Sequence, residues 1–255
     1  KNSKIKVVQV GEGADELFYG YDHWNRYLKL NKFFKPFFKS TKKYSSFKNH
    51  RLNMLSNILF KRTSFAGGAL GFNLKELDNL LVDGLPNHSD LIFYSDNKWK
   101  DYFSNKNSKI SKWMTLIDLK IRLPELLLMR MDKLVMQSAV EARVPFLDHK
   151  LVEYVLSLPE ELLIDLSNTK SLLKKVALKY LPNQIINRKK QGFRAPIGEW
   201  IKKDEEKFYE SVQQFNSLVN LFNERELNHI LNGNDYQKKW YLINLSNWHL
   251  ARVAN

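Results

Sequence analysis

The stretch that decides the expected fold is residues 123–148, which read LPELLLMRMDKLVMQSAVEARVPFLD. Pro124 is expected to open a helix, because proline fixes φ and its missing N–H is not needed in a first turn. Pro145 is expected to end the regular structure, and Asp148 can cap the helix that follows. The apolar side chains after Pro124 predict a mostly buried face, made by Leu126, Leu127, Met129, Leu134 and Met136.

Six charged residues are set within this apolar stretch: Arg130, Asp132, Lys133, Glu141, Arg143 and Asp148. An unpaired charge in an apolar interior costs on the order of several kcal/mol, so these groups are expected to be paired or to face a ligand. Two interpretations follow, an internal ion-pair network between helices or the lining of a site. For Glu141 and Arg143 the network is favoured, with at most a supporting role in a site.

The composition of the chain excludes several classes of protein. Its 255 residues are 44% hydrophobic, enough for one large domain or two small ones, and the absence of cysteine excludes disulfides and a thiol nucleophile. The formal net charge of +14 suggests an anionic partner, but the lysines are spread out and no basic recognition motif is present, so nucleic-acid binding is not expected. The sequence contains no run of about 18 apolar residues, so no membrane span is predicted. We expect a reducing compartment, the cytoplasm.

The N-terminal residues predict a strand that leads into a glycine turn. Residues 5–10, IKVVQV, are rich in β-branched side chains, and Gly11 and Gly13 follow them directly. A helix is expected from Ala14, with acidic residues in its first turn. This order is typical of a site at the carboxyl end of an α/β sheet. No partner strand is evident elsewhere, so the sequence predicts a predominantly α chain with one remnant strand of an open α/β sheet at the N-terminus.

Helical periodicity or capping residues predict most of the other elements. A basic, aromatic segment at residues 22–38 fits either stacking on nucleic acid or rings packed on the core, and the second is favoured. Gly67 and Gly68 lack the Lys-Ser/Thr of a P-loop and predict only a turn. Helix caps are expected at Asn73, Thr169, Asn223 and Asp235. The other expected helices are residues 51–61, 74–81, 99–104, 112–121, 149–156, 170–180, 182–186, 196–201, 224–231 and a last one after Asp235.

Two groups of polar residues are candidates for chemistry. Glu12 and Asp15 flank the glycine turn, where Asp15 could hold Mg²⁺ and Glu12 could accept a proton from an amine. Acidic residues that complement the dipole of a helix N-terminus explain them equally well. Lys190, beside Arg188 and Lys189, suits an anionic ligand, although from the residues alone a solvated basic loop is favoured.

Three motifs together resemble the synthetase domain of glutamine-hydrolysing asparagine synthetases. They are VGEGADE at residues 10–16, the stretch at residues 123–148, and RKKQGF at residues 188–193, in matching order and approximate spacing. The resemblance covers nearly the whole chain. It implies that residues 1–255 form the C-terminal part of an α/β adenine-nucleotide alpha-hydrolase-like (PP-loop ATPase) synthetase domain.

The resemblance also implies a reaction and roles for five residues. In this family ATP adenylates the side-chain carboxylate of aspartate, and ammonia released from glutamine displaces AMP. Glu12 would hold the aspartyl substrate and take a proton from ammonia, and Lys190 would stabilise the departing pyrophosphate. Asp15 would help to bind Mg²⁺. Gly11 would approach the nucleotide with its backbone, and Arg130 would line the same pocket.

The chain departs from the family pattern in three respects. Val10 replaces a serine, the pyrophosphatase loop SGGxDS is not found, and the glutaminase half with its N-terminal cysteine is missing. We therefore expect a C-terminal portion of a longer enzyme, inactive alone and supplied with ammonia by a glutaminase domain; a homodimer is left open. A related amidotransferase or β-lactam-forming ligase is one alternative, and a non-catalytic basic helical binding module is another. The ligase interpretation predicts that Glu12 and Lys190 face each other across one pocket.

Overall fold

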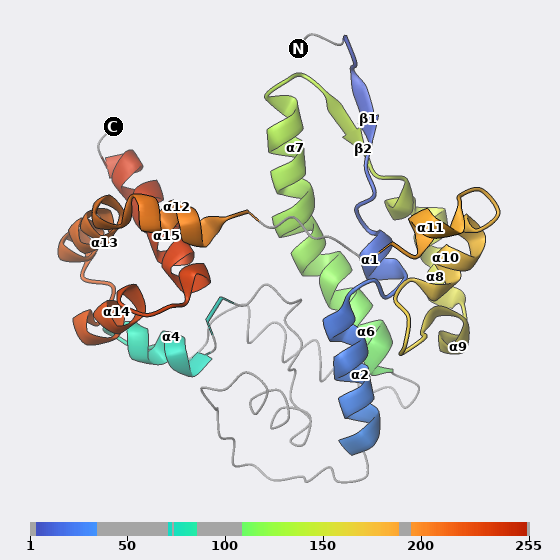
Figure 1. The fold of residues 1–255 in the computed structure, drawn as a ribbon, viewed down its shortest axis with the longest axis horizontal. Coiled ribbons are helices and arrows are strands. Elements are labelled where there is room, and N and C mark those ends of the chain that lie inside the picture. The colour runs from blue at the N-terminus through green and yellow to red at the C-terminus, as the bar shows by residue number, and fades with distance from the viewer. Residues whose placement is uncertain (1–3, 35–70, 73, 86–108, 189–194, 254–255) are drawn as a thin grey trace. The chain divides into compact units, whose positions relative to one another are not determined.

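The computed structural model describes residues 4–34, 71–72, 74–85, 109–188 and 195–253, drawn in colour in Figure 1. The chain divides into two compact units, which are described separately. Of the described residues, the first unit contains 4–34 and 109–188, and the second contains 71–72, 74–85 and 195–253. No helix in these ranges is long and apolar enough to cross a membrane.

A small parallel sheet joins the N-terminal segment of the first unit to the segment that follows its long helical run. Strand β1 (Val7–Gln9) pairs with β2 (Glu141–Arg143), and the N–H of Val10 extends the ladder to the carbonyl of Arg143 at 2.9 Å (Figure 1). The expectation of a single remnant strand is therefore wrong. The sequence Glu-Ala-Arg has no β-branched residue, so β2 depends on its partner rather than on local propensity. The predominantly helical character is confirmed for the described residues.

One long helical run forms the centre of the first unit. It consists of α6 (Ile110–Ile117), the π-helical segment η2 (Asp118–Leu128) and α7 (Met129–Met136). Pro124 lies inside η2, so the prediction that it opens a helix is wrong. In η2 the N–H of Met129 reaches the carbonyl of Pro124, five residues earlier, as in a π-turn.

The buried face of this run is not the one expected from the sequence. Leu126, Met129, Leu134 and Met136 are all exposed, with Leu134 retaining 58% of its accessible surface, so their predicted burial is wrong. The run instead buries residues of α6 and the start of η2, packing α6 against α2 (Asp22–Phe34). Trp24 and Tyr27 of α2 enter this core, as predicted, whereas Phe33 is exposed and residues 35–38 lie outside the described residues. The core side chains are Leu17, Trp24, Tyr27, Trp113, Met114, Ile117 and Leu123.

Short elements complete the first unit. Asp148 caps α8 by accepting hydrogen bonds from the N–H groups of Lys150 and Leu151, as predicted. Thr169 does not cap the next long helix, because Lys170, in a left-handed conformation, precedes its first residue. The elements are α1 (Ala14–Leu17), η3 (Pro145–Leu147), α8 (His149–Ser157), α9 (Glu160–Leu163), α10 (Ser171–Ala177) and α11 (Asn183–Ile186).

The second unit is helical in its described residues and has its own hydrophobic core. Asn223 and Asp235 cap the last two helices through their side-chain oxygens, as predicted. Helix α13 was not predicted, although Phe208, Val212 and Phe215 have helical spacing. The helices are α4 (Leu74–Leu80), α12 (Ile197–Lys203), α13 (Glu205–Val219), α14 (Glu224–Leu231) and α15 (Tyr236–Val253). The expected cap at Asn73, the turn at Gly67 and Gly68, and the expected helices at 51–61 and 99–104 lie outside the described residues.

Candidate active site

The glycine turn after β1 brings two of the three motifs together. Gly13 precedes α1 with φ 90°, a conformation that favours glycine, and an added Cβ would clash with the side chain of Leu147 in η3. Gly11 is exposed, and a Cβ added there would meet nothing within 4 Å. Leu147 of η3 thus packs against the turn at Gly13, while the backbone at Gly11 remains open to a ligand.

Glu12 lies between these glycines and is partly buried. Burial raises the pKa of the Glu12 carboxyl above its usual range, and the carboxylates of Glu16 and Asp15 raise it further. The guanidinium groups of Arg130 and Arg122 act on the Glu12 pKa in the opposite direction. A carboxyl whose pKa is raised is a stronger proton acceptor, which suits a general base. The structure thus places Glu12, Asp15 and Arg130 in one electrostatic neighbourhood.

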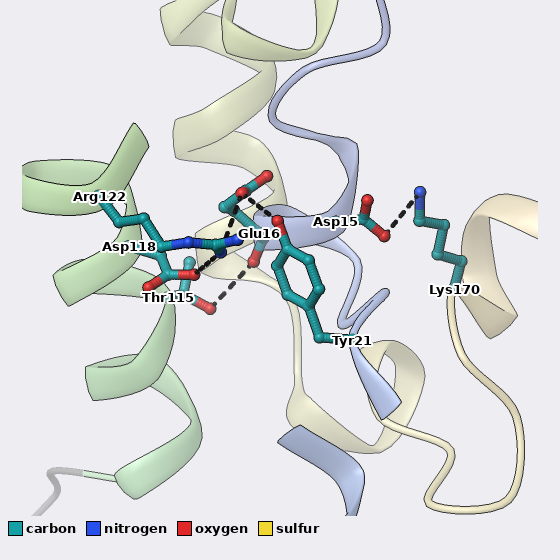
Figure 2. Close-up of polar contacts among 7 residues, drawn as sticks. All are labelled: Asp15, Glu16, Tyr21, Thr115, Asp118, Arg122 and Lys170. Atoms are coloured by element: carbon teal, nitrogen blue, oxygen red, sulfur yellow. Dashed lines mark hydrogen bonds and ion pairs between the residues drawn. The ribbon is translucent and has the colours of Figure 1, made fainter. Parts of the chain in front are cut away.

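Asp15 points to a different partner from Glu12. Its Oδ1 lies 2.9 Å from Nζ of Lys170, and both side chains keep about a quarter of their exposure (Figure 2). This ion pair lies over Gly20, where an added Cβ would collide with the Asp15 carboxylate. The described ranges contain no group of three or more His, Cys, Asp or Glu that could hold a metal. Asp15 could therefore bind Mg²⁺ as a protein ligand only where substrate phosphates and water supply most of the other ligands.

A buried polar network lies behind the turn and was not predicted (Figure 2). Tyr21 donates its hydroxyl hydrogen to Oε1 of Glu16 at 2.6 Å, and Thr115 donates to the backbone carbonyl of Glu16 at 3.3 Å. Nη1 of Arg122 lies 2.9 Å from Oδ2 of Asp118 and 3.9 Å from Oε1 of Glu16. The Arg122 guanidinium also lies over the Tyr21 ring, 4.8 Å from its centroid. The network connects α1 to η2.

Burial dominates the electrostatics of this network. It raises the pKa of Asp118 to about 6, although Arg122 opposes that rise. Burial and the hydrogen bond to Glu16 raise the pKa of Tyr21 well above its usual range. Burial alone would lower the pKa of Arg122, but Tyr21 and Asp118 raise it, so the guanidinium stays charged. An Asp and an Arg four residues apart in an apolar run were the sequence signal that could have indicated this network.

Two other sequence predictions have different outcomes. Glu141 and Arg143 form an ion pair at 2.8 Å in which both side chains are largely exposed, so they make no buried network. Exposed pairs of this kind contribute little to stability. Lys190 lies outside the described residues, and its expected approach to Glu12 stays a prediction.

Residues 1–250 match the family model described as asparagine synthase, which includes every site residue discussed above. The chain belongs to the asparagine synthase family. "Asparagine synthetase [glutamine-hydrolyzing] 1" of Bacillus subtilis is 32% identical over 226 residues, covering 82% of this chain and 34% of that protein. "Putative asparagine synthetase [glutamine-hydrolyzing]" of Mycobacterium tuberculosis H37Rv is 29% identical over 271 residues, covering 98% of this chain and 40% of that protein.

This member of the asparagine synthase family therefore spans between a third and two fifths of the length of these curated relatives. A third relative, "Asparagine synthetase [glutamine-hydrolyzing] 3" of Bacillus subtilis, is 30% identical over 125 residues, 45% of this chain and 19% of that protein. No solved structure matches the chain significantly. Membership thus depends on sequence similarity, and the PP-loop fold expected from the motifs stays a prediction.

Proposed function

We propose that this chain is part of an ATP-dependent ligase that adenylates the side-chain carboxylate of aspartate and amidates it with ammonia from glutamine, giving asparagine. The observation that carries the proposal is Glu12, a partly buried carboxyl of raised pKa in the glycine turn of the family motif. Arg130, from α7, acts on the same carboxyl. Glu12, the proposed acceptor of a proton from ammonia, and Arg130, a cation suited to an anionic ligand, thus come from two different motifs.

The proposed chemistry assigns Glu12 to the second half-reaction. The nitrogen of ammonia attacks the acyl carbon of the aspartyl adenylate, the carbon–oxygen bond to AMP breaks, and AMP leaves. Glu12 takes the proton that the new amide nitrogen loses, which requires it to be deprotonated at the moment of attack. Lys190 is proposed for the first half-reaction, where it would stabilise the charge on pyrophosphate.

Nucleotide and metal binding are proposed for the exposed side of the turn. The open space at Gly11 fits a close approach by the nucleotide, and Arg130 would line the same pocket. When bound, Mg²⁺ would neutralise phosphate charge. Asp15 would be its protein ligand, which requires that carboxylate to exchange Lys170 for the ion.

The test uses the full-length gene product that carries this sequence, with ATP, aspartate and an ammonium salt as nitrogen source. The Glu12→Gln variant is expected to make asparagine at least about 100-fold more slowly, as expected for loss of a general base, while retaining ATP–pyrophosphate exchange. Lys190→Ala should lower pyrophosphate formation by about 100- to 1,000-fold. The exposed Glu153→Gln is the matched control. Asparagine formation that is unchanged in Glu12→Gln would refute the proposal.

Two further measurements address the finer parts of the proposal. Residues 1–255 alone are expected to release no pyrophosphate from ATP and aspartate, and substantial turnover would contradict this. Exchange assays with a panel of carboxylates separate aspartate from another acceptor, such as that of a related amidotransferase or β-lactam-forming ligase. Against the binding-module alternative, the stacking candidates Trp24 and Tyr27 are buried, whereas Phe33 is exposed.

A further inference from the structure

The network of Glu16, Tyr21, Asp118 and Arg122 has no role in the steps above. We propose that Arg122 is a positioning residue, which fixes Glu16 against η2 and thereby helps to set the orientation of Glu12. The inference depends on the proposed function only in treating Glu12 as the group that accepts the proton from ammonia.

Helix α1 cannot hold its own orientation. It has four helical residues, and isolated helices of fewer than about 12 residues are marginal in water. Its orientation must therefore come from tertiary contacts. Glu16, which is 1% exposed, makes the polar contacts to η2 and its neighbours, through its carboxylate to Tyr21 and Arg122 and through its carbonyl to Thr115, while α8 and Phe146 hold α1 from another side. Glu12 precedes α1 by one residue, Gly13, so the orientation of α1 contributes to where the Glu12 carboxyl points.

Arg122 is itself held in place. Asp118, which is fully buried, lies four residues before it in η2 and binds Nη1 on the same helix face. The Tyr21 ring supports the guanidinium from α2's side of the turn, as a cation–π contact. One cation thus serves two buried carboxylates, Asp118 and Glu16. Burial raises the pKa of Asp118, Arg122 opposes that rise, and Glu16 adds a smaller rise.

Two residues of this cluster, Glu16 and Arg122, act on the Glu12 carboxyl through their charges. The charged groups that act on the Glu12 carboxyl are Glu16 and Asp15 on α1, Arg122 on η2 and Arg130 on α7. Arg122 lowers the Glu12 pKa, and Glu16 raises it. Removal of Arg122 would leave Glu16 with one fewer cation beside it. The Glu12 pKa should then rise, and less of the carboxyl would be ionised at a given pH.

The experiment compares Arg122→Met, Arg122→Lys and Lys120→Met in the full-length gene product. Lys120 is an exposed cation on the same π-helical segment, so its variant loses the same charge without touching the network. Glu12 is titrated by carbon-13 NMR of labelled glutamate carboxyls, assigned through Glu12→Gln. Asparagine formation per unit of free ammonia and ATP–pyrophosphate exchange are measured against pH.

In Arg122→Met, the Glu12 pKa is expected to rise and the acid limb of asparagine formation to move to higher pH. The maximal rate should fall about 10- to 100-fold, the cost of a small misplacement of a reacting group, with a smaller effect on exchange. Arg122→Lys should restore the Glu12 pKa but only part of the rate, and Lys120→Met should match the unchanged protein. An unaltered Glu12 pKa in Arg122→Met, or equal losses in both half-reactions, would overturn the inference.

A second variant covers the case in which Arg122→Met does not fold, and the Glu12 titration separates failure of this inference from failure of the proposed function. If Arg122→Met does not fold, Tyr21→Phe removes the hydroxyl bound to Glu16 but keeps the ring, and it should slow asparagine formation more than exchange; equal or no losses would again overturn the inference. If the unchanged protein makes no asparagine, the proposed function fails, whereas the Glu12 titration still decides whether Arg122 acts on Glu12.

Discussion

Replacing Gly13 by alanine should destabilise the first unit through two separate effects. The backbone at Gly13 has φ 90°, and a left-handed conformation costs a residue with a Cβ about 1–2 kcal/mol. The new methyl group would also clash with Leu147, and overpacking of this kind costs about 1–3 kcal/mol. The reduced entropy of the unfolded chain returns about 0.4–1 kcal/mol. The net loss is roughly 1–4.6 kcal/mol, from a total stability of about 5–15 kcal/mol.

The measurement is hydrogen exchange of peptides from α1, β1 and β2, because these report the first unit separately from the second. Gly11→Ala is the matched control: its added Cβ has open space, so the reduced entropy of the unfolded chain should stabilise it by about 0.4–1 kcal/mol. Exchange in Gly13→Ala should accelerate in all three elements, since Leu147 connects the turn to the segment after β2. Equal protection in Gly13→Ala and Gly11→Ala would refute the reasoning.

Two other predictions concern buried charges. Burial raises the pKa of Asp118 in the folded protein to about 6, from an ordinary value of 3.8. Proton binding by Asp118 therefore stabilises the folded state fully below about pH 4. Roughly 3 kcal/mol of that stability is lost as the pH rises through 6. Asp118→Asn should therefore flatten the fall in urea midpoint over this range, and an unchanged slope would contradict the assignment. In the second unit, buried Lys239 donates to Tyr209 at 2.7 Å, so Lys239→Met should cost about 1–3 kcal/mol. Exposed Lys207→Met is the control, and equal thermal midpoints would exclude the role.

Elements that depend on local hydrogen bonds were predictable from the sequence. Asp148 and Asn223 cap helices with their own side chains, and both caps are confirmed. Strand β2 was not predictable in this way, because a three-residue Glu-Ala-Arg segment gains its conformation from pairing with β1. The exposure of Leu134 and Met136 was missed for a similar reason: an apolar pattern indicates that a face can be buried, not that another element covers it.

The candidate site shows the same division. The turn residues Glu12 and Asp15 were visible because glycines and acids stand together in the sequence. The network around Arg122 was not, since its members come from segments about 100 residues apart and become partners only when α1 packs on η2. Lys170 was missed likewise, as its pairing with Asp15 depends on the approach of α10.

The segment around Pro145 supports the turn physically rather than chemically. This segment, residues 141–148, begins with β2 (Glu141–Arg143), which fixes β1 by pairing, and its Leu147 packs against Gly13. Phe146 meets the ring of Phe18 edge-on, with centroids 6.1 Å apart, which holds the end of α1. The charges of Glu141 and Arg143 neutralise each other at the surface instead of entering the site. Substitutions in this segment should therefore affect Glu12 through the position of its backbone, whereas substitutions at Arg122 should affect it through charge as well.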